Sequence, residues 1–184
     1  MGEAMKGIIN KGIQDLVESK FGSETWDKVK EVAGCNEPFF AAGKDYPDEL
    51  TVSLVEVVSE TTGLSIEDVM VEFGKFWVPN TGCKSYPSYF QIAGTSSREF
   101  LMNMDKVHTL VTRSLPNAAP PRFEYEELED GRLLMHYKSS RRLCPVLRGL
   151  ILGVGIHHDE ELQVEEIACS LRGDPHCIME VTFP

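Results

Sequence analysis

The sequence predicts an α+β fold, in which a helical N-terminal part is followed by a C-terminal antiparallel sheet with helices. Apolar residues recur at helical spacing through roughly the first 115 residues, and strand-like segments follow the proline-rich stretch 116–121. The hydrophobic content of 42% is sufficient for a packed core in a chain of 184 residues. We expect one domain over residues 1–184, with a helical subdomain at 1–60 and a sheet-containing subdomain at 61–184.

Three helices are predicted in the first third of the chain. Ser23 is expected to cap the second helix and Gly34 to end it, and residues 48–61 form the third. The first helix, which Gly22 ends, is predicted from apolar residues at helical spacing: Ile8, Ile9, Ile13, Leu16 and Val17.

Two further helices are predicted before the prolines. Ser65, followed by acidic residues, is a typical N-cap for a helix that runs through about Phe76. Ser96 or Ser97 begins another helix, which runs to about Leu115.

The remaining chain reads as two hairpins with a helix between them. The first hairpin spans residues 123–139 and turns at an Asp-Gly pair, and the helix covers residues 144–157. The second hairpin joins residues 162–171 and 177–183 around Gly173.

Composition excludes several classes of function. The net charge is −11, so the clustered basic residues that bind nucleic acid or anionic membranes are absent. No apolar run is long enough for a membrane span, and the first residues lack the apolar core of a signal peptide. We therefore expect a cytoplasmic protein. The five cysteines form no Cys-x-x-Cys-His pattern, which excludes covalent haem attachment of the c type.

His108 stands out on the helix that begins near Ser97. It falls within an apolar stripe, and a histidine on a buried face needs a partner for its ring nitrogens. A core histidine bonded to a carbonyl satisfies this requirement. An axial ligand to a metal also satisfies it, since neutral imidazole binds iron. The stripe consists of Leu101, Met104, Val107, Val111 and Leu115.

The segment Tyr-x-Ser-x-Arg is a second candidate. If the strand continues, alternation places Tyr137, Ser139 and Arg141 on one face. All three side chains donate hydrogen bonds to anions, and arginine does so bidentately with carboxylates. Alternatively, the segment is a solvent-exposed strand end whose polar residues bind no anion.

Together these motifs resemble the H-NOX family, the haem nitric oxide/oxygen-binding domains that also form the haem domain of soluble guanylate cyclase. His108 in Met-Asp-Lys-Val-His stands 29 residues before Tyr137, as the family requires. The resemblance covers nearly the whole chain. It includes Met5-Lys6-Gly7-Ile8-Ile9-Asn10, Phe73-Gly74 and Pro120-Pro121-Arg122.

The resemblance implies a haem b held between the two subdomains. His108 is then the proximal ligand, and Tyr137, Ser139 and Arg141 hold the haem propionates. Pro121 presses on the porphyrin and distorts it. The distal side of the haem is expected to be lined by Ile9, Ile13, Trp77, Val146 and Leu150.

The resemblance also implies a gas and a signalling role. Oxygen-binding members carry a distal tyrosine where this chain has Val146, so nitric oxide is the expected ligand and oxygen is disfavoured, with carbon monoxide as a further ligand. The indole N–H of Trp77 is a donor if it points inward. No catalytic apparatus is evident. As in bacterial relatives, we expect the domain to regulate a separate histidine kinase or cyclic-di-GMP enzyme.

Three cysteines suggest a zinc site. Cys169 and Cys177 are symmetric about Gly173, so a hairpin places them opposite each other, and Cys144 begins the nearby helix. Some family members bind zinc here with a histidine where this chain has Glu166. Zinc accepts a carboxylate, whereas His176 alternates to the other face. Three buried or redox-active thiols are the alternative.

Two other functions compete with a haem sensor. One is a haem-free thiol or zinc module that senses redox state or nitric oxide at cysteine. The other is a haem enzyme, disfavoured because no distal acid–base histidine is evident. The colour and haem content of the purified protein distinguish them.

Overall fold

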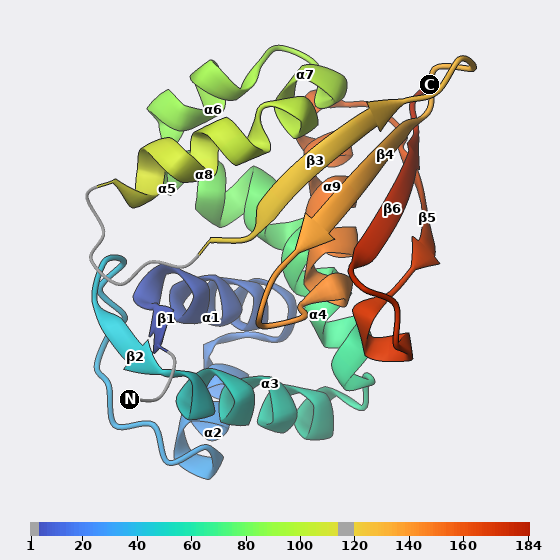
Figure 1. The fold of residues 1–184 in the computed structure, drawn as a ribbon. Coiled ribbons are helices and arrows are strands. Elements are labelled where there is room, and N and C mark those ends of the chain that lie inside the picture. Colours follow the sequence, from blue (N-terminus) through green and yellow to red (C-terminus); the bar gives the residue numbers. More distant parts are fainter. Residues whose placement is uncertain (1–3, 114–119) are drawn as a thin grey trace. The chain divides into compact units, whose positions relative to one another are not determined.

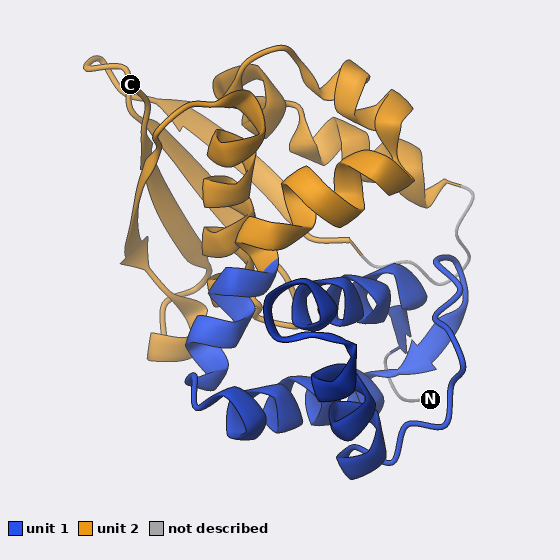
Figure 2. Cartoon of the chain, turned by 180° about the vertical axis from the view of Figure 1, so that it is seen from behind, with its two compact units in different colours: residues 1–73 blue, residues 74–184 orange. Residues whose placement is uncertain are grey.

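The computed structural model describes residues 4–113 and 120–184 and confirms the α+β fold (Figure 1). The chain divides into two compact units, Met1–Phe73 and Gly74–Pro184 (Figure 2). The expected subdomain boundary at residue 60 lies inside a helix of the first unit, and the single-domain organisation stays a prediction. Within the described ranges, no helix is long and apolar enough to cross a membrane.

In its described residues, the first unit contains three complete helices, the beginning of a fourth and a small two-stranded sheet. The helices are α1 (Gly7–Phe21), α2 (Ser23–Val32) and α3 (Asp48–Thr62). The short strands β1 (Ala4–Lys6) and β2 (Asp45–Pro47) pair antiparallel. Three residues are too few to show strand periodicity, so the sequence did not reveal them. The buried core includes Ile13, Leu16, Val17, Trp26, Val29, Leu54 and Val58.

The junction of α1 and α2 differs from the prediction that Ser23 is a cap. Ser23 is the first residue of α2, and Gly22 occupies the N-cap position without a side-chain bond. Gly22 is also the C-cap of α1 and has a φ of +88°. Because one residue separates the two helices, that residue needs a backbone conformation that glycine adopts readily.

Helix α4 (Ile66–Trp77) begins as predicted and spans the boundary of the two units. The Ser65 Oγ accepts a hydrogen bond from the Asp68 N–H at 3.1 Å, which is the expected N-cap. A π-helical turn (Val78–Gly82) follows directly, and then the short helices α5 (Cys83–Ser85) and α6 (Pro87–Ala93).

The helix expected from Ser96 or Ser97 to Leu115 is two helices, α7 (Ser97–Met102) and α8 (Met104–Thr112). Ser96 is the N-cap, as expected. The break falls at Asn103, whose side chain donates hydrogen bonds to the carbonyls of Ala93 and Glu99 at 2.9 and 3.0 Å. Asparagine competes in this way with helical bonding. Leu115 lies outside the described residues.

The sheet of the second unit has the strand order β3-β4-β6-β5, and all neighbours are antiparallel. Its two hairpins are those predicted, but two strands end earlier than expected. β4 ends before Ser139, and β5 ends before a 3₁₀ turn at Ser170–Arg172. The elements are β3 (Arg122–Glu127), β4 (Leu133–Lys138), α9 (Cys144–His158), β5 (Gln163–Ala168) and β6 (Cys177–Thr182).

Helix α9 packs on one face of this sheet and also against the end of α4 (Figure 1). A Cβ atom on Gly74 would lie 2.4 Å from the backbone nitrogen of Leu150, and one on Gly153 would lie 2.7 Å from the carbonyl oxygen of Gly74. The two helix backbones therefore approach each other closely only because these residues are glycines. This contact fixes Trp77 relative to α9.

Candidate functional site

The imidazole of His108 lies on α8 and is partly buried. Its Nδ1 is buried and has no hydrogen-bond partner among the described residues. Burial lowers the pKa of His108, although the charge of Asp105 opposes the shift. The ring is therefore neutral near pH 7 and keeps a lone pair that is available to a metal.

Asp105 ties α8 to β3. Its Oδ1 accepts a hydrogen bond from the backbone N–H of Phe123 at 3.1 Å, and its Oδ2 accepts one from Arg122 at 2.8 Å. The backbone N–H of Asp105 donates to the Tyr125 hydroxyl at 3.3 Å. The sequence alone did not single out Asp105. The signal was an acidic residue in the first turn of the helix, three residues before His108.

An aromatic row connects the helix to the Tyr-x-Ser-x-Arg motif. The ring centroid of Phe123 lies 5.7 Å from that of His108 and 5.7 Å from that of Tyr137. Burial raises the pKa of Tyr137, and a hydrogen bond with Ser139 opposes the shift. The phenol therefore stays protonated at neutral pH and remains a hydrogen-bond donor.

Tyr137, Ser139 and Arg141 do not lie on one strand face, because the chain turns after Lys138. Because β4 ends at Lys138, strand alternation does not extend to Arg141. The Ser139 Oγ instead accepts a hydrogen bond from the backbone N–H of Arg141 at 3.3 Å. Arg142 follows with a φ of +51° and turns the chain into α9. The structure thus brings Tyr137, Ser139 and the backbone of Arg141 together in the turn between β4 and α9.

The other residues expected around a cofactor lie in both units. Pro121 is half-buried directly before β3, and Val146 and Leu150 are half-buried on α9. In the first unit, α1 carries Ile13, which is buried, and Ile9, which is half-buried.

Trp77 ends α4 in a tightly defined position. Its indole Nε1 is buried and has no hydrogen-bond partner in the described part of the chain. A Cβ atom on Gly82 would lie 2.5 Å from the indole ring. The π-helical turn thus places a glycine where any side chain would displace the tryptophan.

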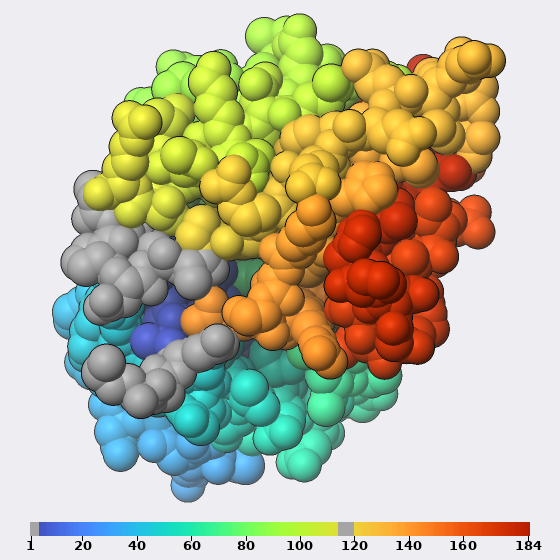
Figure 3. All heavy atoms as spheres, viewed as in Figure 1, coloured from blue at the N-terminus to red at the C-terminus, as the bar shows by residue number. Residues whose placement is uncertain are grey.

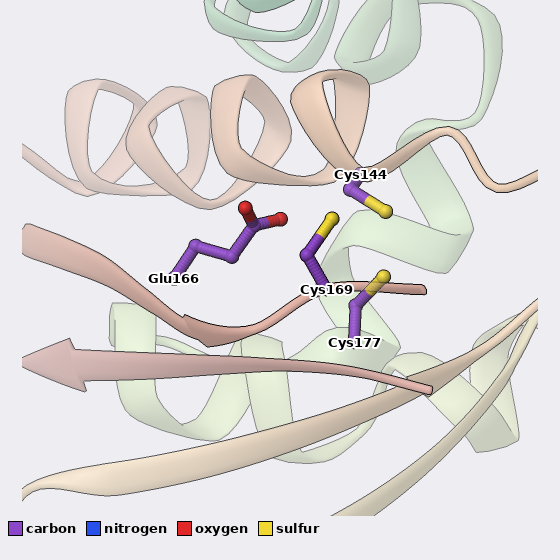
Figure 4. Close-up of side chains that lie close together, drawn as sticks. All are labelled: Cys144, Glu166, Cys169 and Cys177. Atoms are coloured by element: carbon purple, nitrogen blue, oxygen red, sulfur yellow. The ribbon is translucent and has the colours of Figure 1, made fainter. Parts of the chain in front are cut away.

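A second cluster lies between α9 and the hairpin of β5 and β6 (Figure 4). One ligand atom from each of its four residues lies within 4.8 Å of all the others. β5 pairs Ala168 with Ile178 after a register shift between Glu166 and Ala168, and Cys169 and Cys177 are the next residues along the two segments. The members are Cys144, Glu166, Cys169 and Cys177, and all three cysteines are buried and free of disulfides.

The thiols of this cluster are electrostatically coupled. Burial raises the pKa of Cys144, and the neighbouring Cys177 and Cys169 raise it further. Burial also acts to raise the pKa of Cys177, but hydrogen bonds with Cys144 and Ser170 outweigh it and lower the pKa. Three such thiols ionise together only if a cation compensates their charge.

Two side chains near the cluster have other partners. Glu166 forms an ion pair with Arg172, with the Nη1–Oε2 distance at 2.6 Å. His176 precedes Cys177 and faces the other way, so that its Nε2 lies 2.9 Å from Nδ1 of His136. Glu166 thus contributes to the cluster, whereas His176 does not.

Sequence comparisons match most of this chain to a known family. The family model described as Haem-NO-binding matches residues 6–166. Soluble guanylate cyclase 89Da of Drosophila melanogaster is 26% identical over 137 residues, which are 74% of this chain and 20% of the relative. Soluble guanylate cyclase gcy-32 of Caenorhabditis elegans is 29% identical over 158 residues, which are 82% of this chain and 22% of that relative. The chain spans about a fifth of the length of these curated relatives.

Solved structures share the fold over almost the whole chain. An H-NOX protein from S. oneidensis in the Fe(II)NO state has a TM-score of 0.88 at 24% identity, with 98% of this chain and 99% of that chain covered. An oxygen-binding H-NOX domain related to soluble guanylate cyclases, solved as an oxygen complex, has a TM-score of 0.82 at 26% identity. The match covers 97% of this chain and 95% of that chain.

Proposed function

Because the chain belongs to the Haem-NO-binding family, the H-NOX domains, we propose that it is a nitric oxide sensor that binds haem b through His108. The single observation that carries this proposal is the neutral imidazole of His108, whose buried Nδ1 has no hydrogen-bond partner among the described residues. A haem-free thiol or zinc module would explain neither the neutral imidazole of His108 nor the match to the Haem-NO-binding family. The relatives include the soluble guanylate cyclases, so haem-based gas sensing is the general role.

The residues of the second unit fit a haem. His108 would hold the iron, and the aromatic ring of Phe123 would keep water from the imidazole. Tyr137, Ser139 and Arg141 would donate to the propionates, since a protonated phenol, a hydroxyl and a guanidinium all bind carboxylates. Pro121 would press on the porphyrin. Ile9, Ile13, Trp77, Val146 and Leu150 stay the proposed distal residues.

The proposed selectivity rests on the lack of a donor at Val146. A bound oxygen molecule is stabilised by a hydrogen-bond donor, whereas nitric oxide needs none. Trp77 is a second potential donor, because its buried Nε1–H has no hydrogen-bond partner in the described part of the chain. We propose that the indole does not reach the bound gas, which makes nitric oxide the main ligand and carbon monoxide a secondary one.

The proposed signal begins at His108. When bound, a ferrous haem would supply an iron that takes nitric oxide, and we propose that the imidazole of His108 would then give up its bond to that iron. Helix α8 would then be restrained by the contact of Asp105 with β3 but no longer by His108, so that α8 would be able to change its position. Such a bistable element regulates a partner. We propose a separate histidine kinase or cyclic-di-GMP enzyme as that partner, with no catalysis by this domain.

Replacement of His108 tests the haem assignment. The wild-type chain should bind one haem and change its absorption spectrum with nitric oxide. His108→Gly should lose haem, and added imidazole should restore binding by filling the space that the side chain leaves. His157→Gly is the matched control, because His157 is exposed at the end of α9. Normal haem uptake and an unchanged ferrous spectrum in His108→Gly without imidazole would refute the proposal.

We further propose that the cysteine cluster holds a structural zinc ion. The supporting observation is the set of three thiols and one carboxylate within 4.8 Å of one another, which matches the donors and number of ligands that zinc prefers. Zinc would compensate the thiolate charge. To bind zinc, Glu166 would use the carboxylate oxygen that Arg172 does not contact, or it would break its ion pair with Arg172.

Elemental analysis tests the zinc proposal. Protein purified under reducing, chelator-free conditions should contain about one zinc per chain. Cys169→Ser should abolish binding and destabilise the hairpin of β5 and β6, whereas Cys83→Ser, outside the cluster, should retain the metal. Wild-type protein without zinc would instead support the interpretation as three reduced thiols.

A further inference from the structure

Two histidines outside the proposed haem and zinc sites lie together on the outer face of the four-stranded sheet. His136 is on β4, where alternate residues are buried, and its side chain points away from the core. His176 likewise precedes the buried Cys177. Nδ1 of His136 and Nε2 of His176 are 2.9 Å apart, and the ring centroids are 5.2 Å apart. The two rings thus bring two nitrogen atoms to one point.

A carboxylate faces this pair. Glu124 on β3 lies directly opposite His136 in the strand register, and cross-strand neighbours are in side-chain contact range. A hydrogen bond from Lys138 and its charge lower the pKa of Glu124, and the charges of His136 and His176 lower it further. Glu124 is therefore an ionised oxygen donor within electrostatic reach of both rings.

We propose that His136 and His176, assisted by Glu124, bind a divalent transition metal ion of the Cu(II) or Ni(II) class. Metal–imidazole bonds are about 2.0–2.1 Å long. Two such bonds to nitrogens 2.9 Å apart enclose about 90°. That is the angle between adjacent ligands in tetragonal Cu(II) and Ni(II) sites, and both ions accept imidazole nitrogens as ligands.

Binding requires only local changes. The hydrogen bond between the rings breaks, the shared proton leaves, and both rings turn their lone pairs toward the ion. Glu124 exchanges its bond to Lys138 for the metal or uses its second oxygen. The net charge of −11 favours cations, and α9 lies on the other face of the sheet (Figure 1). Figure 3 shows atoms of β3, β4 and β6 at the front surface of the second unit.

This site is separate from the cysteine cluster. Cys177 points to the face covered by α9, while His176 points to the opposite face. A test must therefore fill the cysteine cluster first. Nickel is the suitable probe, because Ni(II) does not oxidise thiols, whereas Cu(II) does.

The experiment is calorimetric titration of the zinc-saturated, haem-loaded chain with Ni(II) alone. We expect one nickel per chain, with binding at least about tenfold weaker in His136→Gln and in His176→Gln and a smaller loss in Glu124→Gln. His157→Gln is the matched control, since its ring also lies beside a second histidine, 4.9 Å from that of His158. After all five free cysteines are blocked, electron paramagnetic resonance with Cu(II) should show two coordinating nitrogens.

Two results would overturn the proposal. Nickel binding that is unchanged in both His136→Gln and His176→Gln would exclude the pair, and loss of binding only in His157→Gln would place nickel at the end of α9. Both target histidines are partly exposed, so we expect the variants to fold, and circular dichroism checks this. If His136→Gln disturbs β4, His176→Gln still decides, because His176 lies outside the strands.

Discussion

Removal of the Asp105 carboxylate should loosen the helix that carries His108. In the structure this carboxylate bridges α8 and β3, since one oxygen accepts from the backbone N–H of Phe123 and the other from Arg122. Asp105→Ala removes both bonds. Asp105→Asn keeps an uncharged acceptor for the backbone N–H, and Arg122→Ala removes only the ion pair. The three variants therefore separate the two interactions.

The backbone interaction should dominate. A hydrogen bond to a charged group contributes about 1.5–3 kcal/mol to stability, and the N–H of Phe123 would be left unpaired beside a buried ring. The ion pair contributes about 0–1 kcal/mol, because the Arg122 side chain is 65% exposed and water screens it. We expect a loss in the free energy of unfolding of about 2–4 kcal/mol for Asp105→Ala and at most about 1 kcal/mol for Arg122→Ala.

Urea unfolding of the haem-loaded protein measures these losses. Resonance Raman spectroscopy of the iron–histidine stretch adds a local measurement, since a looser α8 should broaden or shift that band. Equal unfolding midpoints for Asp105→Ala and Arg122→Ala would refute the reasoning, because the backbone bond would then contribute nothing. A value for Asp105→Asn equal to that of Asp105→Ala would show that the charge of the carboxylate, and not an acceptor alone, stabilises the contact.

Two further predictions concern the haem pocket. Arg141→Ala should speed haem dissociation, since a charge-assisted bond is worth about 1.5–3 kcal/mol, and Ser139→Ala should have a smaller effect; identical dissociation rates in Arg141→Ala and wild type would contradict the role in propionate binding. The ferrous wild-type protein should form no stable oxygen complex in air, whereas Val146→Tyr should form one. A long-lived oxygen complex in the wild type that Trp77→Phe abolishes would instead identify the indole as the donor.

The sequence predicted elements where periodicity and caps agree. Helix α3 was expected at residues 48–61 and ends at Thr62, and α9 was expected at residues 144–157 and ends at His158. The break at Asn103 was not predicted, because it depends on a bond to the carbonyl of Ala93, ten residues away. A single side-chain contact of this kind produces no periodic pattern in the sequence.

The site was predicted unevenly for the same reason. His108 and the Tyr-x-Ser-x-Arg motif have recognisable residue types and spacing, and the cysteines were found from hairpin symmetry. Asp105 and Phe123 were missed, because their roles come from the packing of α8 on β3. The pair of His136 and His176 was also missed, since the strand register alone brings residues forty positions apart together.

The register also connects the proposed haem site with the proposed zinc site. Tyr137, whose phenol bonds Ser139, lies directly opposite Cys177 on the neighbouring strand. Cys144 follows Arg141 by one short turn and begins α9. The turn that would hold the propionates is thus anchored at both ends by residues beside the cysteine cluster. A metal ion bound there would link α9 to β6 and so restrict this turn, because both of its ends would be held by one set of ligands. Loss of that ion should therefore affect the haem even though no cysteine belongs to the proposed haem site.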